Sequence, residues 1–119
     1  MSTSNTYMAV FLGTKAGRAA WDALPEAERR KREGEGIAAW KAWVAKHQSS
    51  ILEMGGPLGK TKKVSKSGIE DTSNQMGAFT VVRADSHEAA AKLFEGHPHF
   101  TIFPGDSVEI MPILPVPGG

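Results

Sequence analysis

Two histidines separated by a proline, in the stretch EGHPHFTIFPG (95–105), are the residues of this chain best suited to chemistry. If His97 and His99 lie on a strand, both rings point to one face, which suits a metal ion. Such a site requires a third protein ligand. The candidates in the sequence are Asp85, Glu109 and His47.

The same stretch also has the features of a turn. Gly96 is suited to end a preceding helix and Pro98 is unsuited to continue it. We therefore expect His97-Pro98-His99 to be first a turn that leads into the final strand, and we expect no metal. At least one ring should face a cleft, because a polar ring beside apolar residues needs a partner.

Asp85 is the acidic partner that we favour for these rings. A carboxylate beside an imidazole orients it and raises its basicity, as a general base requires. The alternative role of Asp85 is to complement the N-terminus of the helix that follows it.

A long helix predicted at residues 37–54 carries the other candidates. Its apolar residues recur at the spacing of one buried helix face. Trp40 and Trp43 are either core residues or walls of a pocket for a flat, hydrophobic ligand. His47 is either a structural, hydrogen-bonded histidine or a pocket-lining one. We assign Met54, at the end of the same face, to the ligand site.

Two other motifs have simpler explanations. GGPLGKT (55–61) resembles a phosphate-binding loop, but Met54 stands where that motif needs its first glycine. The segment also follows a predicted helix, whereas a phosphate cradle follows a strand. A basic run fits a solvated edge strand better than an anion site, and comprises Lys60, Lys62, Lys63 and Lys66.

The elements that must position these residues follow from hydrophobic periodicity and turn signals. Strands are predicted at 6–13, within 57–71, at 76–85 and at 106–113. A short helix near Pro25 should be interrupted by Gly34 and Gly36. The helix at 37–54 should stop at Gly55-Gly56-Pro57, and a last helix should run from Ser86 to Gly96. This order is the α+β, ferredoxin-like βαββαβ arrangement.

The totals describe one domain, residues 1–119, with tails at 1–5 and 114–119. The 14 Lys and Arg residues nearly balance the 13 Asp and Glu residues, so the chain lacks the basic footprint of a nucleic-acid binder. Cysteine is absent, which excludes disulfides and thiolate chemistry. Neither a secretory leader nor a membrane-spanning stretch is evident. We therefore expect a cytoplasmic protein that binds neither membranes nor nucleic acids.

Three segments together resemble the YCII-related family of small dimeric α+β barrels. They are AWKAWVAKHQSSILEMGGPLG, GAFTVVRADSHEAAAKLFEGHPHF and GDSVEIMPI, within a resemblance that covers about residues 6–113. It implies a ferredoxin-like subunit that dimerises sheet against sheet. It also implies a cleft between sheet and helices, where histidine and aspartate lie. The matching positions here are His47, Asp85, His97 and His99.

Two classes of function follow. The leading hypothesis is a homodimer that binds an unknown small molecule and uses His and Asp for acid–base catalysis without a cofactor. The alternative is a non-catalytic dimeric binding or sensor module that uses the same cleft.

Overall fold

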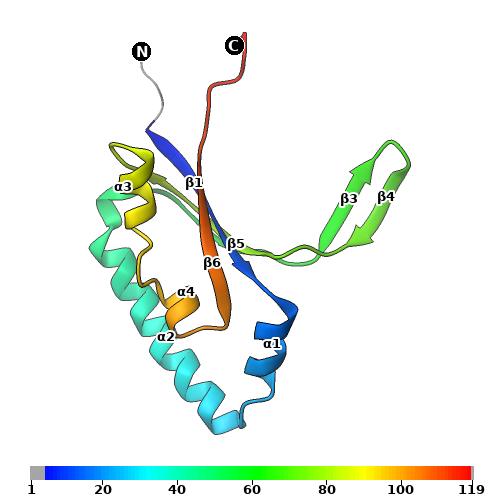
Figure 1. Ribbon diagram of the computed structural model, residues 1–119, viewed down its shortest axis with the longest axis vertical. Helices are drawn as coiled ribbons and strands as arrows, with labels where there is room; N and C mark the ends of the chain where they lie inside the picture. The colour runs from blue at the N-terminus through cyan, green and yellow to red at the C-terminus, as the bar shows by residue number, and fades with distance from the viewer. Residues whose placement is uncertain (1–4, 119) are drawn as a thin grey trace.

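A four-stranded antiparallel sheet forms the frame of the protein (Figure 1). In spatial order its strands are β2 (Ile51–Pro57), β5 (Met76–Arg83), β1 (Thr6–Gly13) and β6 (Gly105–Pro112). Five helical segments accompany them, namely α1 (Lys15–Asp22), α2 (Glu26–Lys46), η1 (Gln48–Ser50), α3 (His87–Lys92) and α4 (Pro98–Thr101). This computed structural model describes residues 5–118, so most of the predicted N-terminal tail and residue 119 lie outside the described residues. The ferredoxin-like α+β fold is confirmed.

Helix α2 begins earlier than predicted and continues through both glycines. It starts at Glu26, directly after Pro25, and ends at Lys46. Gly36 lies where the ring of Phe103 packs on the helix, and a Cβ there would overlap that ring. Gly36 therefore marks a close contact, not a break. Ile37, predicted to be buried, is 52% exposed.

Residues 51–57 form a strand, so the prediction of helix through Met54 is wrong. The turn η1 separates α2 from β2, and Ile51 then pairs with Val82 of β5. Gly55 adopts a positive φ of 65°, and a Cβ at this position would overlap the carbonyl group of Phe79. Here glycine belongs to an irregular strand and does not end a helix.

The sequence suggested that the lysine-rich segment is the edge strand of the main sheet. This prediction is wrong, because the segment forms a separate hairpin. β3 (Thr61–Ser65) pairs only with β4 (Gly68–Thr72) among the described strands. The hairpin is inserted between β2 and β5 and extends away from the body (Figure 1). Its lysines are exposed, as expected of a solvated segment.

The two faces of the sheet differ in what covers them. The face under the helices carries the core, in which Tyr7, Ala9 and Phe11 of β1 pack with Trp43 and Phe94. Because side chains alternate along a strand, the neighbouring residues point to the other face. Strand pairing places five apolar side chains there, namely Met8, Val10, Phe79, Val81 and Met111. We call this surface the open face.

The predicted start of the last helix is confirmed. The Oγ atom of Ser86 accepts a hydrogen bond from the amide of Ala89 at 3.0 Å, which caps α3. The helix ends at Lys92, and a turn follows that Gly96 completes with a positive φ of 69°. This turn delivers the chain to His97, at the junction of the helices and the sheet.

Candidate functional site

The His97-Pro98-His99 motif links α3 to β6 as predicted, but it does so as the start of a one-turn helix that was not predicted. His97 is the N-cap of α4 and has extended backbone angles, while Pro98 occupies the first helical position. The His97 Nδ1 atom accepts a hydrogen bond from the His99 amide at 3.0 Å. The motif thus uses one nitrogen of the first histidine to cap a helix.

The imidazole of His97 is fully buried in an aromatic cage. Its centroid lies 4.5 Å from that of Trp40, 4.7 Å from that of Trp43 and 5.1 Å from that of Phe11. Phe94 completes the cage at 5.9 Å. The cage therefore draws its walls from the central strand β1, the long helix α2 and the turn after α3.

The second ring nitrogen of His97 has no hydrogen-bond partner among the described residues. Because Nδ1 accepts from an amide, the proton of the neutral ring lies on Nε2. Aromatic rings are only weak acceptors for an N–H group. His97 thus presents an unsatisfied Nε2–H donor inside the cage. Leaving such a donor buried costs about 1–3 kcal/mol.

His97 is neutral at physiological pH. Burial, and secondly the neighbouring His99 and His47, together lower the pKa of this imidazole to about 4. In its resting state the ring is a hydrogen-bond donor and a very weak base. A negatively charged group beside Nε2 would raise the pKa again.

His99 is held by the backbone of the sheet. Its Nε2 atom donates a hydrogen bond to the carbonyl oxygen of Leu12 at 2.7 Å, which ties α4 to the end of β1. The ring also packs against Gly105, where a Cβ would overlap it. These contacts give His99 a structural role and leave His97 as the histidine with a free donor.

His47 and the two tryptophans lie at the C-terminal half of α2. The indole nitrogen of Trp43 donates to the carbonyl oxygen of Leu93 at 2.7 Å. His47 directly follows the last residue of the helix, and the centroid of its ring lies 5.1 Å from that of the Trp43 ring. Burial, and secondly Lys46, lower the pKa of His47. Trp40 and Trp43 therefore join the histidines in one cluster.

Asp85 and Met54 lie outside this cluster. Asp85 is exposed and has no hydrogen bond or ion pair within residues 5–118, so it is not the partner of either ring. The reason is that His97 and His99 take backbone groups as their partners. Met54 is on β2 and about half exposed, because the helix ends before it. Within the same residues, no three His, Asp or Glu side chains are grouped to hold a metal ion.

Three aromatic residues at or near the site were not predicted as site residues from the sequence. Phe11 and Phe94 form walls of the cage, and the alternation of Tyr7, Ala9 and Phe11 along β1 was the available signal for Phe11. His87 stacks on Tyr7 and its Nε2 atom donates to the carbonyl oxygen of Ile110 at 2.7 Å. It fastens α3 to β6 at the surface.

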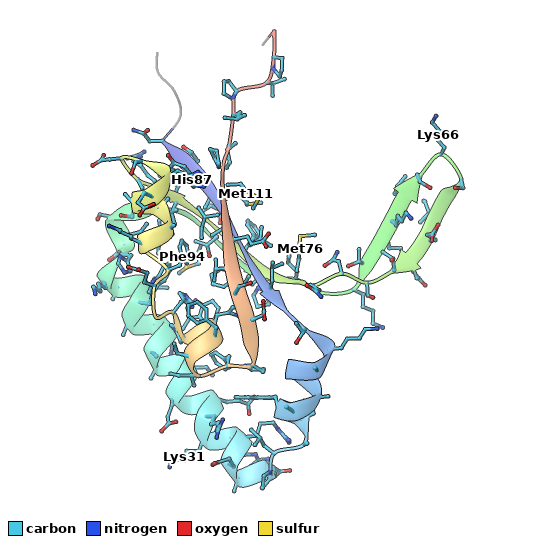
Figure 2. The ribbon with its side chains drawn as sticks, in the orientation of Figure 1. Lys31, Lys66, Met76, His87, Phe94 and Met111 are labelled. Carbon is cyan, nitrogen blue, oxygen red and sulfur yellow. The ribbon has the colours of Figure 1, made fainter. Side chains whose placement is uncertain are left out.

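A shallow depression of about 290 Å³ lies beside the cage, between α3, α4 and β6. Its apolar part includes Phe94, Phe100 and Val108, and its polar rim includes Glu95 and Asp106. Phe94, which Figure 2 shows in the turn between α3 and α4, borders both the depression and His97. A second depression of about 330 Å³, between α2 and α4, is mostly polar.

The fold and the buried cluster define an α+β protein with a ferredoxin-like sheet and an aromatic, histidine-containing interior between sheet and helices. The structure is similar to that of 5-chloro-2-hydroxyhydroquinone dehydrochlorinase (TftG) from Burkholderia phenoliruptrix AC1100 in complex with 2,5-dihydroxybenzoquinone. The TM-score is 0.53 with 14% sequence identity, over 89% of this chain and 90% of that chain. This likeness supports the fold alone.

No protein-family profile matches the sequence, and no curated protein matches it. Among the described residues, no helix is long and apolar enough to cross a membrane.

Proposed function

We propose that this protein binds a small, flat organic molecule between its helices and its sheet, and that His97 recognises an oxygen atom of that molecule. The observation that carries the proposal is the buried Nε2–H donor without a partner. A buried group of this kind requires an explanation, and the one that we propose is a ligand. A carbonyl or phenolate oxygen placed beside Nε2 would satisfy the donor.

The cage around His97 suits a flat, apolar ring. Four aromatic rings form its walls, namely those of Phe11, Trp40, Trp43 and Phe94. Ligand sites combine such walls with one or two orienting polar groups. The 2,5-dihydroxybenzoquinone bound by the similar protein TftG is a ligand of this chemical class.

Phe94 is the side chain through which a ligand would reach His97. It borders the surface depression on one side and the cage on the other. Phe94 lines the depression of about 290 Å³, and we propose that rotation of its ring opens a path from there to the Nε2 atom. The route therefore needs a side-chain movement but no change in the sheet.

The chemistry available to His97 is electrostatic. A neutral imidazole that donates Nε2–H to a carbonyl oxygen stabilises negative charge that develops on that oxygen. As this charge grows, the pKa of His97 rises, and the ring becomes able to hold a proton. The proposed catalytic group is thus His97, which first donates a hydrogen bond and only then takes up a proton. The His99 amide orients its ring, and Asp85 takes no part.

A non-catalytic binding module is the second candidate. It is favoured by the absence of a carboxylate partner for His97, whose only hydrogen-bond partner among the described residues is a backbone amide. A general acid–base pair would ordinarily include a carboxylate that orients the ring. Turnover of a bound ligand separates the two candidates.

We also propose that two copies of this chain pair through the open face. That face is apolar at Met8, Val10 and Phe79, and the helices cover only the opposite face. Small sheets of this kind bury such a face against another layer. Pairing open face to open face gives the dimeric α+β barrel.

The test uses 2,5-dihydroxybenzoquinone and related hydroxylated rings as probes. ¹H–¹⁵N spectra of the histidine side chains should show the His97 Nε2–H signal move when the probe binds, while the His87 signal stays in place. His97→Phe keeps a ring in the cage but removes the donor, so affinity should fall at least about 10-fold. His87→Phe is the matched control. Unchanged affinity of His97→Phe would falsify the proposed site.

A further inference from the structure

The β3–β4 hairpin exposes an apolar pair on one of its faces. Val64 and Ile69 are direct cross-strand partners, and they are 75% and 72% exposed. The alternation of side chains places the Lys62–Asp71 ion pair on the same face. A two-stranded hairpin is marginally stable in water unless it packs against something. The hairpin therefore has both an exposed apolar surface and a physical need for a neighbour.

The hairpin stands on the same side of the sheet as the open face. In Figure 1 the sheet is seen close to edge-on, with α2, α3 and α4 on one side and the hairpin on the other. Met111 and Met76 point into the angle between sheet and hairpin (Figure 2), and both are more than two-fifths exposed. A body that packs on the open face must therefore also meet the hairpin.

The chain as a whole exposes more surface than a compact protein of its size. A compact protein of 12.8 kDa is expected to expose roughly 6,300 Å². This chain exposes 8239 Å², a surplus of about 1,900 Å², whereas a stable interface needs about 800 Å² per partner. The radius of gyration, 16.5 Å, is likewise above the roughly 13.5 Å expected of a compact domain of this length.

The charges of the hairpin are largely compensated within it. Lys62 forms an ion pair with Asp71, and Lys63 stands opposite Glu70 in the strand pairing. An arm with an apolar face and few uncompensated charges suits an apolar, self-complementary partner better than a strongly charged one. In a two-fold dimer each copy presents the same face and the same arm.

We infer that the β3–β4 hairpin is an arm that clasps a second copy of this chain, with Val64 and Ile69 packed against the partner subunit beside its open face. The inference rests on the proposed dimer and adds the element that holds it together. The arm of each copy lies outside the sheet of the other, so the two arms enclose the paired sheets. In this proposal a second copy of the chain fills the angle between sheet and hairpin.

Sedimentation velocity over a range of concentrations tests the arm. The unaltered protein should be a dimer, and Val64→Asp with Ile69→Asp should raise the dimer dissociation constant at least about 10-fold. Ser65→Asp with Thr72→Asp places the same two negative charges on the opposite face of the hairpin, and the dissociation constant of this variant should not change. Circular dichroism checks that each variant remains folded.

The outcomes separate the arm from the dimer. A monomeric parent protein overturns both proposals. A dimeric parent whose dissociation constant is unaffected by the double substitution overturns the arm alone and leaves the open-face dimer standing.

A second measurement does not depend on substituting the apolar pair. The chain has no cysteine, so Ser67→Cys at the tip of the hairpin takes a single spin label. Chains that carry the spin label but no ¹⁵N are mixed with ¹⁵N-labelled chains of the parent protein. Any broadening of amide signals from the open-face strands of the ¹⁵N-labelled chain then comes from the other subunit. Such broadening supports the proposal that the hairpin contacts the partner. A dimeric mixture without such broadening rejects it.

Discussion

The His97 imidazole meets the Trp40 indole at nearly a right angle, with 4.5 Å between ring centroids and 89° between planes. This contact and three other rings hold the imidazole in an apolar cage while the His99 amide occupies its Nδ1 atom. The arrangement favours the neutral ring, because the cage offers no partner to a charged one. Its first consequence is a dependence of stability on pH.

We expect the free energy of unfolding to fall as the pH falls from about 6.5 to about 4. The pKa of His97 is about 4 in the folded chain and 6.5 for an ordinary histidine, so the unfolded state binds the proton first. The stabilisation is complete above pH 6.5 and is lost progressively below it. Between pH 7.5 and pH 4.5 the loss from this one group is about 2–3 kcal/mol.

Urea unfolding at both pH values measures this effect, and His97→Phe provides the control. Phenylalanine fills the cage without titrating, so the variant should lose less stability on acidification than the parent protein. Equal losses in the two proteins would show that other groups cause the acid sensitivity.

Two glycines two residues apart in α2 should respond in opposite ways to alanine. A Cβ at Gly34 meets nothing within 4 Å, so Gly34→Ala should stabilise the protein by about 0.5–1 kcal/mol through helix propensity. A Cβ at Gly36 overlaps the Phe103 ring, so Gly36→Ala should destabilise it by about 1–3 kcal/mol. Thermal unfolding ranks the pair, and a stabilising Gly36→Ala would contradict the packing.

Trp43→Phe should lower the free energy of unfolding by more than the smaller ring alone would explain. The substitution removes the indole donor to Leu93 and leaves a carbonyl oxygen without that partner. Trp21→Phe is the matched control, because Trp21 is also buried but its indole has no hydrogen bond among the described residues. Chemical denaturation should give Trp43→Phe an extra loss of about 1 kcal/mol. No difference between the two would mean that the hydrogen bond does not contribute to stability.

Asp85→Asn should leave ligand binding unchanged. The carboxylate is exposed and contacts neither His97 nor His99 through a hydrogen bond. Calorimetric titration with 2,5-dihydroxybenzoquinone at two pH values compares this variant with His97→Phe. A loss of affinity in Asp85→Asn equal to that in His97→Phe would restore the acid–base pair that the sequence suggested.

The sequence predicted three of the four strands of the main sheet, because those strands carry local signals, and missed β2. The runs 6–13 and 76–85 are rich in apolar and β-branched residues, and β1 and β5 lie there. Ser86 was recognisable as a cap from its position before an alanine-rich segment. Gly96 and Pro98 likewise indicated the turn at His97.

The errors arose where a residue's role depends on a distant neighbour. Gly36 reads as a helix breaker until Phe103, far along the chain, is seen to occupy the space of its missing side chain. Ile51 fits the helical apolar spacing, yet pairing with Val82 places it in a strand. The partners of the histidine rings are backbone groups, and no pattern of side chains announces those.

The alternation of side chains along β1 and β5 has an evolutionary consequence. Phe11 and Val82 belong to the covered core, whereas Val10 and Val81, one position away, belong to the open face. If the proposed dimer forms through the open face, mutations at the second pair should alter self-association without reshaping the histidine cage, and mutations at the first pair should do the reverse. Adjacent codons in the same strand would then be exposed to separate selective pressures, so that the proposed ligand and the proposed assembly would change independently in descendants of this chain.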